Sequence, residues 1–280
     1  MYLSLCNEVL RDLPFAEQCR VAAALGYEGL ELAPFTFDPE TPHELPAAKR
    51  REIRQIAGDH GLSIVGLHWL LVAPRGLSVT TSDVELRRRT VDVLHNLVEL
   101  CAELGGRVLV HGSPPARRVE DAESPDAARA NLVECLASVG EAARKAGVVY
   151  CIEPLAPSET ALVNTVSEAV AIVKEIDNPA LRTMIDTSAA GRAESEPVDK
   201  VIRDWWPSGC LAHVQVNDRN RRAAGQGEDR FGPILRALRD VGYEGALSAE
   251  PFIYEPDGPT TAAVNAGYLK GLLEILKEET

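Results

Sequence analysis

The feature that most constrains the fold is an alternation of short apolar runs with longer helical patterns, which occurs eight times in 280 residues. Each run has the length of a buried β-strand, and the segments between the runs have the apolar spacing of helices. The expected strands are residues 2–6, 30–32, 62–68, 107–111, 148–153, 181–186, 211–216 and 246–250. The expected helices are residues 14–25, 46–60, 82–104, 125–146, 167–176, 196–206, 231–241 and 260–277.

Eight strand–helix units predict an α/β fold, a closed (β/α)₈ TIM barrel formed by residues 1–280 as a single domain. A doubly wound open sheet is the alternative, but no Gly-x-Gly-x-x-Gly motif follows the first strand. Links from helix to strand are short and contain glycine, whereas links from strand to helix are long and polar. The active site of such a barrel lies on the face built by the strand-to-helix loops.

The composition excludes several classes of protein. A formal charge of −13 argues against a nucleic-acid partner, since such binding rests on Lys and Arg. No apolar run approaches the roughly 18–20 residues that a membrane span needs, and the N-terminal residues lack the features of a signal peptide. We therefore expect a cytoplasmic protein, and a homo-oligomer is compatible with the sequence. The six cysteines include no Cys-x-x-Cys pair, so we expect buried free thiols.

Four apolar runs each present one side chain that can bind a metal near the strand end, namely Glu153, Asp186, His213 and Glu250. Three carboxylates and one imidazole suit a hard or borderline divalent ion such as Mn²⁺, Mg²⁺ or Co²⁺. A paired carboxylate or a core histidine is the ordinary alternative at any one of these positions. Their occurrence at the ends of strands five to eight favours a shared metal site.

Further polar and aromatic residues fall at other strand ends. His68 with Trp69 follows the third strand and His111 ends the fourth, so these residues are candidates for the lining of a pocket. Glu31 in the second strand is a further candidate. Packing in the core is the alternative for each of them.

Several short motifs occur in a characteristic order along nearly the whole chain. They are Cys6-Asn7-Glu8, residues 26–36, Gly66-Leu67-His68-Trp69, His111-Gly112-Ser113-Pro114, Ile152-Glu153-Pro154-Leu155, Ile185-Asp186-Thr187, residues 213–218, and Gly225-Gln226-Gly227 before Phe231. In this order they resemble the sugar phosphate isomerase/epimerase superfamily of xylose isomerase-like TIM barrels. Within that superfamily the chain is most similar to the ketose 3-epimerases.

The resemblance implies metal ligands at Glu153, Asp186, His213 and Glu250, with Mn²⁺ as the expected ion and Co²⁺ or Mg²⁺ as alternatives. It implies that Glu153 and Glu250 also act as acid and base, abstracting a proton next to a carbonyl through a metal-bound enediolate.

The resemblance also bears on substrate contacts. Glu159 and Arg219 match a substrate-contacting Glu and Arg of the epimerases, with a solvated loop pair as the alternative. Ala189 stands where the epimerases carry a histidine, and this difference leaves the exact reaction open.

The leading hypothesis is a metal-dependent isomerase or epimerase of a small sugar or polyol. A lyase or dehydratase acting on a keto-sugar, keto-glycoside or keto-cyclitol is the runner-up, because the same enediolate can expel a leaving group. Endonuclease IV shares the barrel but needs a multi-histidine zinc cluster and a basic surface. A non-enzymatic sugar-binding barrel would be expected to have an incomplete ligand set.

Overall fold

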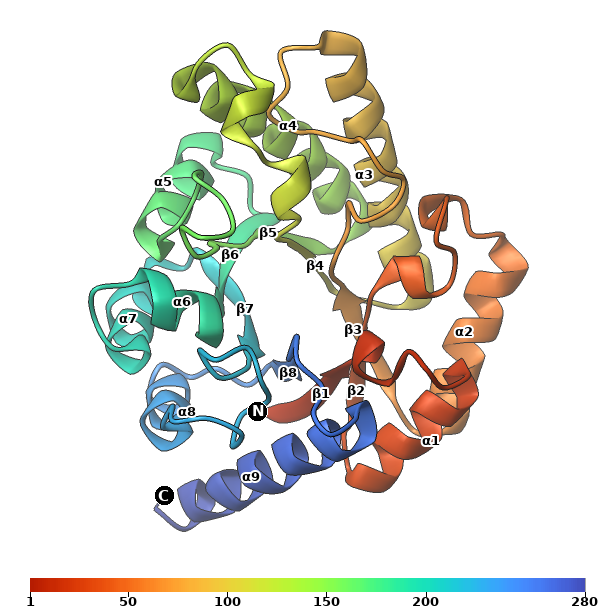
Figure 1. The fold of residues 1–280 in the computed structure, drawn as a ribbon, viewed down its shortest axis with the longest axis vertical. Helices are drawn as coiled ribbons and strands as arrows, with labels where there is room; N and C mark the ends of the chain where they lie inside the picture. The colour runs from red at the N-terminus through yellow and green to blue at the C-terminus, as the bar shows by residue number, and fades with distance from the viewer. Residues whose placement is uncertain (280) are drawn as a thin grey trace.

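The computed structural model describes residues 1–279 and contains eight parallel strands closed into a barrel in sequence order (Figure 1). The strands are β1 (Tyr2–Cys6), β2 (Gly29–Leu32), β3 (Ser63–Leu67), β4 (Val108–His111), β5 (Val149–Ile152), β6 (Leu181–Asp186), β7 (Leu211–Val216) and β8 (Ala246–Ala249). The ring closes where β1 pairs with β8, from Tyr2 opposite Ala246 to Leu5 opposite Ala249. The predicted barrel is therefore confirmed.

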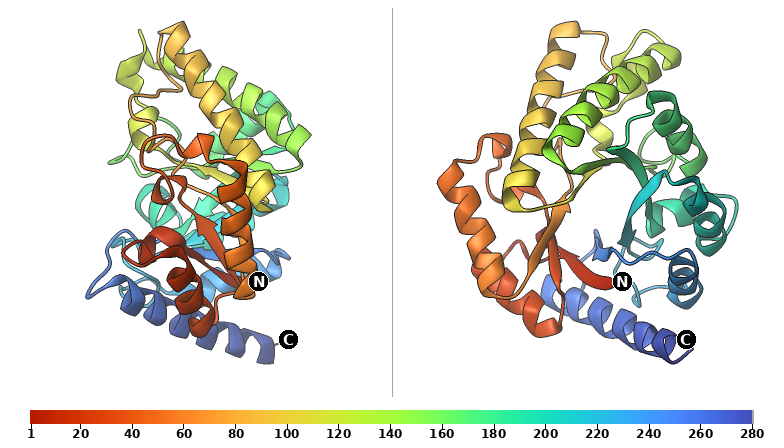
Figure 2. Two further views of the ribbon diagram at one scale, coloured as in Figure 1. Left: turned by 90° about the vertical axis from the view of Figure 1, so that its right-hand side faces the viewer. Right: turned by 180° about the vertical axis from the view of Figure 1, so that it is seen from behind.

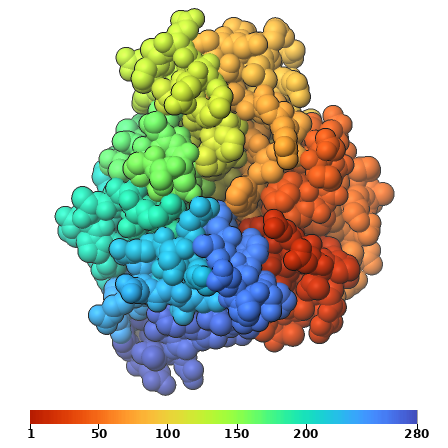
Figure 3. Space-filling model, viewed as in Figure 1, coloured from red at the N-terminus to blue at the C-terminus, as the bar shows by residue number. Residues whose placement is uncertain are grey.

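The helices form a layer around the strands, which both further views of the ribbon show (Figure 2). They are α1 (Phe15–Leu25), α2 (Ala47–Asp59), α3 (Val84–Leu104), α4 (Pro125–Ala146), α5 (Val166–Ile176), α6 (Thr187–Ala193), α7 (Val198–Trp205), α8 (Phe231–Asp240) and α9 (Gly258–Glu278). In the space-filling view the segments of the chain follow one another around the centre in sequence order (Figure 3).

Local sequence signals explain where the helices begin and end. Ser124 accepts a hydrogen bond from the Ala127 amide at the start of α4, and Pro125 occupies the first helical position, where no amide proton is needed. At the other end Gly147 adopts a left-handed conformation, with φ of 72°, and its amide donates to the carbonyl oxygens of the last turn. Such caps turn the chain directly from a helix into the next strand.

The helices differ from the sequence prediction at two places. Helix α6 was not predicted; it begins directly after β6 because the Asp186 carboxylate caps it by accepting from the Ala189 amide. The helix predicted from residue 82 has its N-cap one residue later: Ser82 with Glu85 has the spacing of a capping box, but Asp83 is the cap and accepts from the amides of Glu85 and Leu86.

The buried apolar residues form two clusters, one outside the ring of strands and one inside it. The larger one packs the outer faces of the strands against the helices. The smaller one lies within the barrel and consists of Val65, Val108, Val110, Cys151, Met184 and Ala246. The six cysteines are buried free thiols, as predicted. Within residues 1–279 we find no helix with the length and apolar character needed to cross a bilayer.

Candidate active site

Three of the predicted metal ligands come together at the C-terminal ends of the strands. Glu153 follows β5, Asp186 is the last residue of β6, and Glu250 follows β8. One carboxylate oxygen from each lies within 4.8 Å of the others, and all three side chains are buried. Closure of the barrel is what brings residues almost 100 positions apart into one cluster.

These carboxylates destabilise one another in their charged form. Burial, followed by repulsion from Asp186, raises the pKa of Glu153 well above its ordinary value. Burial raises the pKa of Asp186 to about 7, and burial with repulsion from Glu153 and Asp186 raises the pKa of Glu250. A positive charge placed among them would relieve both the desolvation and the repulsion.

Unpaired oxygen atoms show that the cluster suits a divalent cation. Asp186 accepts from the Ala189 amide through Oδ1 at 2.6 Å, but its Oδ2 is buried and has no hydrogen-bond partner among residues 1–279. Oε2 of Glu250 and Oε1 of Gln215 are also buried and unpaired. Buried polar atoms rarely remain unsatisfied, and oxygen ligands are those that Mg²⁺ and Mn²⁺ prefer. The residues present therefore fit a divalent metal.

His213, the fourth predicted ligand, lies deeper in the barrel. It pairs with Met184 in the strand register, whereas Gln215 pairs with Asp186. The two-residue step along β7 corresponds to about 6–7 Å. Nε2 of His213 lies 2.7 Å from Oε2 of Glu31, and among residues 1–279 His213 belongs to no group of three close ligand atoms.

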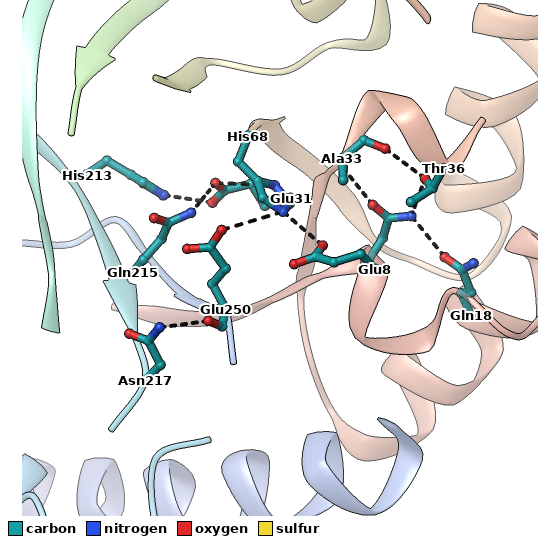
Figure 4. Close-up of polar contacts among 11 residues, drawn as sticks. Glu8, Gln18, Glu31, Ala33, Thr36, His68, His213, Gln215, Asn217 and Glu250 are labelled. Atoms are coloured by element: carbon teal, nitrogen blue, oxygen red, sulfur yellow. Dashed lines mark hydrogen bonds and ion pairs between the residues drawn. The ribbon is translucent and has the colours of Figure 1, made fainter. Parts of the chain in front are cut away.

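Gln215 was missed by the sequence analysis and lies level with Asp186. Its Nε2 donates to Glu31 Oε1 at 2.9 Å, which leaves Oε1 as the unpaired atom (Figure 4). Two strand residues separated by two positions point to the same side. The sequence alone could not say which of His213 and Gln215 stands at the level of the carboxylates.

Glu31 connects the inner polar residues rather than lining the cavity. Burial opposes its charge, but the charge and hydrogen bond of His213, with His68 nearby, lower the pKa of Glu31 to about 2. Glu31 is therefore a buried carboxylate that holds the side chains of β7 in place.

A cavity of about 280 Å³ opens above this layer. Its wall contains five predicted site residues, namely His68, Trp69, Glu153, Glu159 and Glu250. The rest of the wall is formed by Val110, Gly112, Ser113, Pro114, Pro115, Leu155, Arg221 and Phe252. Among the described residues 1–279, Glu31, His111 and Arg219 are predicted site residues that do not belong to this wall.

Trp69 provides the aromatic side of the cavity. Its backbone has φ of 53°, a conformation that bulky residues seldom adopt, and its ring lies 5.8 Å from that of Phe252. Phe35 packs against the same indole edge-on, and the indole Nε1 is buried without a partner. Backbone strain of this kind is concentrated at functional sites.

His111 and Arg219 have other partners. Nδ1 of His111 lies 2.7 Å from the Tyr150 hydroxyl, and burial together with Arg117 lowers the pKa of His111 to about 3. Arg219 is 58% exposed and forms an ion pair with Asp229.

Arg221, two residues further along, is the arginine of the cavity wall. Its guanidinium carbon lies 4.5 Å from the centre of the Phe252 ring. Glu159 in the same wall accepts a hydrogen bond from Arg192 at 2.9 Å.

Arg117 is a second residue that the sequence did not point to. It is fully buried, and its Nη1 donates to the carbonyl oxygen of Glu153 at 2.8 Å. Its positive charge favours the ionised form of Glu153 and partly offsets the effect of burial. Arg117 lies in a loop, where no strand or helix pattern distinguishes it from other arginines, so the sequence alone does not show that it is buried beside Glu153.

A family model described as xylose isomerase-like TIM barrel matches residues 19–272. D-psicose 3-epimerase of Ruminiclostridium cellulolyticum is 29% identical over 237 residues, which cover 82% of this chain and 76% of that protein. Fructoselysine 3-epimerase of Shigella flexneri is 24% identical over 246 residues, which cover 85% of each chain.

Solved structures have the same fold. A D-psicose 3-epimerase from Clostridium cellulolyticum H10, solved with D-tagatose, has a TM-score of 0.83 at 19% identity and covers 98% of this chain and 99% of its own. The strands and helices can therefore be superimposed along almost the entire length of both chains.

Proposed function

The chain belongs to the xylose isomerase-like TIM barrel family, and from this premise we propose that it is a divalent-metal-dependent epimerase of a ketose or a related keto-sugar. The names of its relatives support the reaction class. The observation that carries the proposal is the meeting of Glu153, Asp186 and Glu250 in one cluster, two of whose members, Glu153 and Glu250, belong to the wall of the cavity. Mn²⁺ is the ion we expect, with Co²⁺ or Mg²⁺ as alternatives.

The ligand set we propose is Glu153, Asp186 and Glu250 with Gln215 Oε1 as the fourth donor, in place of His213. The unpaired oxygen of Gln215 and its register with Asp186 support this choice. A divalent ion held there would polarise the carbonyl of the substrate and offset negative charge that develops on its oxygens.

The protein's own contribution to the reaction is acid–base chemistry by two glutamates. One of Glu153 and Glu250 removes the proton from the carbon next to the carbonyl, which gives an enediolate of the substrate. The other returns a proton to the opposite face of the same carbon, and the configuration is inverted. The scheme requires one glutamate to be ionised and the other to be protonated before the reaction, because one acts as the base and the other as the acid.

The remaining wall residues orient the sugar and exclude water. Trp69 and Phe252 present apolar faces, whereas His68, Glu159 and Arg221 offer polar groups for hydroxyls. Most of a small sugar would be enclosed in a cavity of this size, as is usual for a small-molecule site.

The test is proton exchange in D₂O. Mn²⁺-loaded protein is incubated with a panel of free and phosphorylated ketoses and keto-inositols, and NMR measures deuterium uptake next to the carbonyl. We expect one substrate to gain deuterium and an epimer to form, and Glu153→Gln and Glu250→Gln each to abolish uptake. Glu17→Gln, an exposed control on α1, should leave it unchanged. Full exchange in either active-site variant would refute the two-base scheme.

A lyase remains the second candidate because Ala189 places no imidazole beside Asp186. The same proton removal would then expel a leaving group from the neighbouring carbon. The NMR experiment separates the two reactions, since elimination gives a product that has lost the leaving group, whereas epimerisation gives a stereoisomer of the substrate.

A further inference from the structure

A second cluster of potential ligands lies against the first. Glu8 comes from the short helix η1 (Asn7–Leu10) after β1, His68 follows β3, and Glu250 follows β8. One ligand atom from each residue lies within 4.8 Å of the others, and the three side chains are buried (Figure 4). The two clusters share Glu250.

The two distances measured from His68 bracket the separation expected between ligands of one ion. Nε2 of His68 lies 2.8 Å from Oε2 of Glu8 and 4.0 Å from Oε1 of Glu250. Two ligands that each lie about 2.1 Å from a cation are roughly 3–4 Å apart. The 4.0 Å separation is too long for a hydrogen bond, so Glu250 is directed toward His68 without being bonded to it.

His68 also has the surroundings of a metal-binding histidine. Its second nitrogen, Nδ1, lies 3.7 Å from Glu31 Oε1 and has no hydrogen-bond partner in the part of the chain that the structure describes. Histidine ligands generally direct the nitrogen that does not bind metal toward a carboxylate, which fixes the tautomer and the ring. Glu31 is itself held by His213 and Gln215, so it is already fixed in position.

The charge of the combined clusters favours two cations over one. Four buried carboxylates converge here, from Glu8, Glu153, Asp186 and Glu250. The positive charge of Arg117 and the negative charge of Glu31 offset each other, so with neutral imidazole at His68 two divalent ions would balance the four negative charges. A proton on His68 would satisfy Glu8 but would leave Oε2 of Glu250 without a partner.

We propose that the protein binds a second divalent cation between Glu8, His68 and Glu250, with the Glu250 carboxylate bridging the two ions. One imidazole nitrogen and two carboxylates suit Mn²⁺, Co²⁺ or Zn²⁺. His68 and Glu250 belong to the cavity wall, so the ion has a path from solvent. The inference rests on the proposed function only in that both sites use Glu250.

The experiment counts Mn²⁺ ions bound per chain by equilibrium dialysis with metal analysis, and locates them by anomalous diffraction from crystals soaked in MnCl₂. We expect two ions per wild-type chain, with one anomalous peak between Glu8, His68 and Glu250. Glu8→Gln and His68→Asn should each bind one ion, and Asp186→Asn should lose the other. Glu28→Gln, an exposed control before β2, should still bind two ions.

The outcomes separate this inference from the proposed function. One ion per wild-type chain, located at Glu153 and Asp186, would overturn the second site and leave the first intact. No bound ion at either place would refute the metal dependence as well. Because the diffraction measurement uses the wild-type protein, a variant that folds poorly does not weaken the test.

Discussion

Among the single residues of the site, Glu31 is the one that fixes the positions of the side chains around it. It accepts hydrogen bonds from His213 and Gln215 through different oxygens and lies 3.7 Å from His68 Nδ1. A carboxylate with these partners stays ionised inside the barrel, where an unpaired charge would be strongly destabilising. The side-chain nitrogen of Gln215 therefore donates to Glu31, and its side-chain oxygen is available to bind a metal ion.

This arrangement predicts different effects for two neighbouring substitutions. Gln215→Leu should weaken Mn²⁺ binding by about 100-fold, because it removes a ligand oxygen, whereas His213→Gln should weaken it only about 10-fold through Glu31. Isothermal titration with MnCl₂ measures both affinities. The reverse order of effects would restore His213 to the ligand set.

His111 predicts how stability depends on pH. Its pKa is about 3 in the folded protein and about 6.5 in the unfolded chain, so between these values only the unfolded chain binds the proton. Stability contributed by neutral His111 is therefore present above pH 6.5 and falls on acidification, by about 2 kcal/mol between pH 6.5 and 5. Urea unfolding at several pH values should show a shallower acid slope for His111→Asn. His95 lies on α3 in the outer layer, where its Nε2 is 3.1 Å from the Ser138 hydroxyl, and the control His95→Asn should keep the wild-type slope.

At the scale of secondary-structure elements, the start of α3 offers a direct test of helix capping. Asp83→Ala removes an acceptor that serves the amides of Glu85 and Leu86, so the free energy of unfolding should fall by about 1 kcal/mol. Ser82→Ala should have a much smaller effect, since Ser82 lies one residue before the cap. Urea denaturation of the two variants would contradict the assignment if Ser82→Ala proved the more damaging.

The elements show which parts of the structure a sequence can predict. The eight strands follow from short apolar runs, and each helix with a clear apolar face was predicted within a few residues of its position. Helix α6 was missed because Thr187–Ala193 has no such face; it is held by the Asp186 cap and by burial. A helix that is capped by the last residue of the preceding strand, as α6 is by Asp186, cannot be predicted from an apolar pattern, because the cap forms only when the barrel sets the direction of the chain.

The sequence predicts which strands carry the site residues and which face of each strand they occupy, but not how far along the strand each one lies. Glu153, Asp186 and Glu250 stand at strand ends, where a single carboxylate follows an apolar run. His213 and Gln215 point to the same side of β7, and only the register with β6 shows that Gln215 is level with Asp186. The sequence pointed to Arg219, whereas Arg221 is the arginine in the cavity wall, because the path of the loop after β7 decides which arginine reaches the cavity.

At the scale of the whole molecule, the site exists only when the barrel is closed. Glu8 and Glu250 lie at opposite ends of the chain and meet because β1 pairs with β8. The unfolded chain has no comparable cluster of ligands, so a divalent cation should bind the folded state with strong preference.

Metal binding should therefore appear as an increase in global stability. With free Mn²⁺ at 100 times its dissociation constant, the free energy of unfolding should rise by about 2.7 kcal/mol for each independent site. Because the ion also removes repulsion among Glu153, Asp186 and Glu250, its dissociation constant should be low, and this increment should be reached at a lower Mn²⁺ concentration than at an ordinary surface site. Urea unfolding with Mn²⁺ and with EDTA measures the difference. Asp186→Asn should reduce the increment, and an equal increment in that variant would mean that the stabilising ion binds elsewhere.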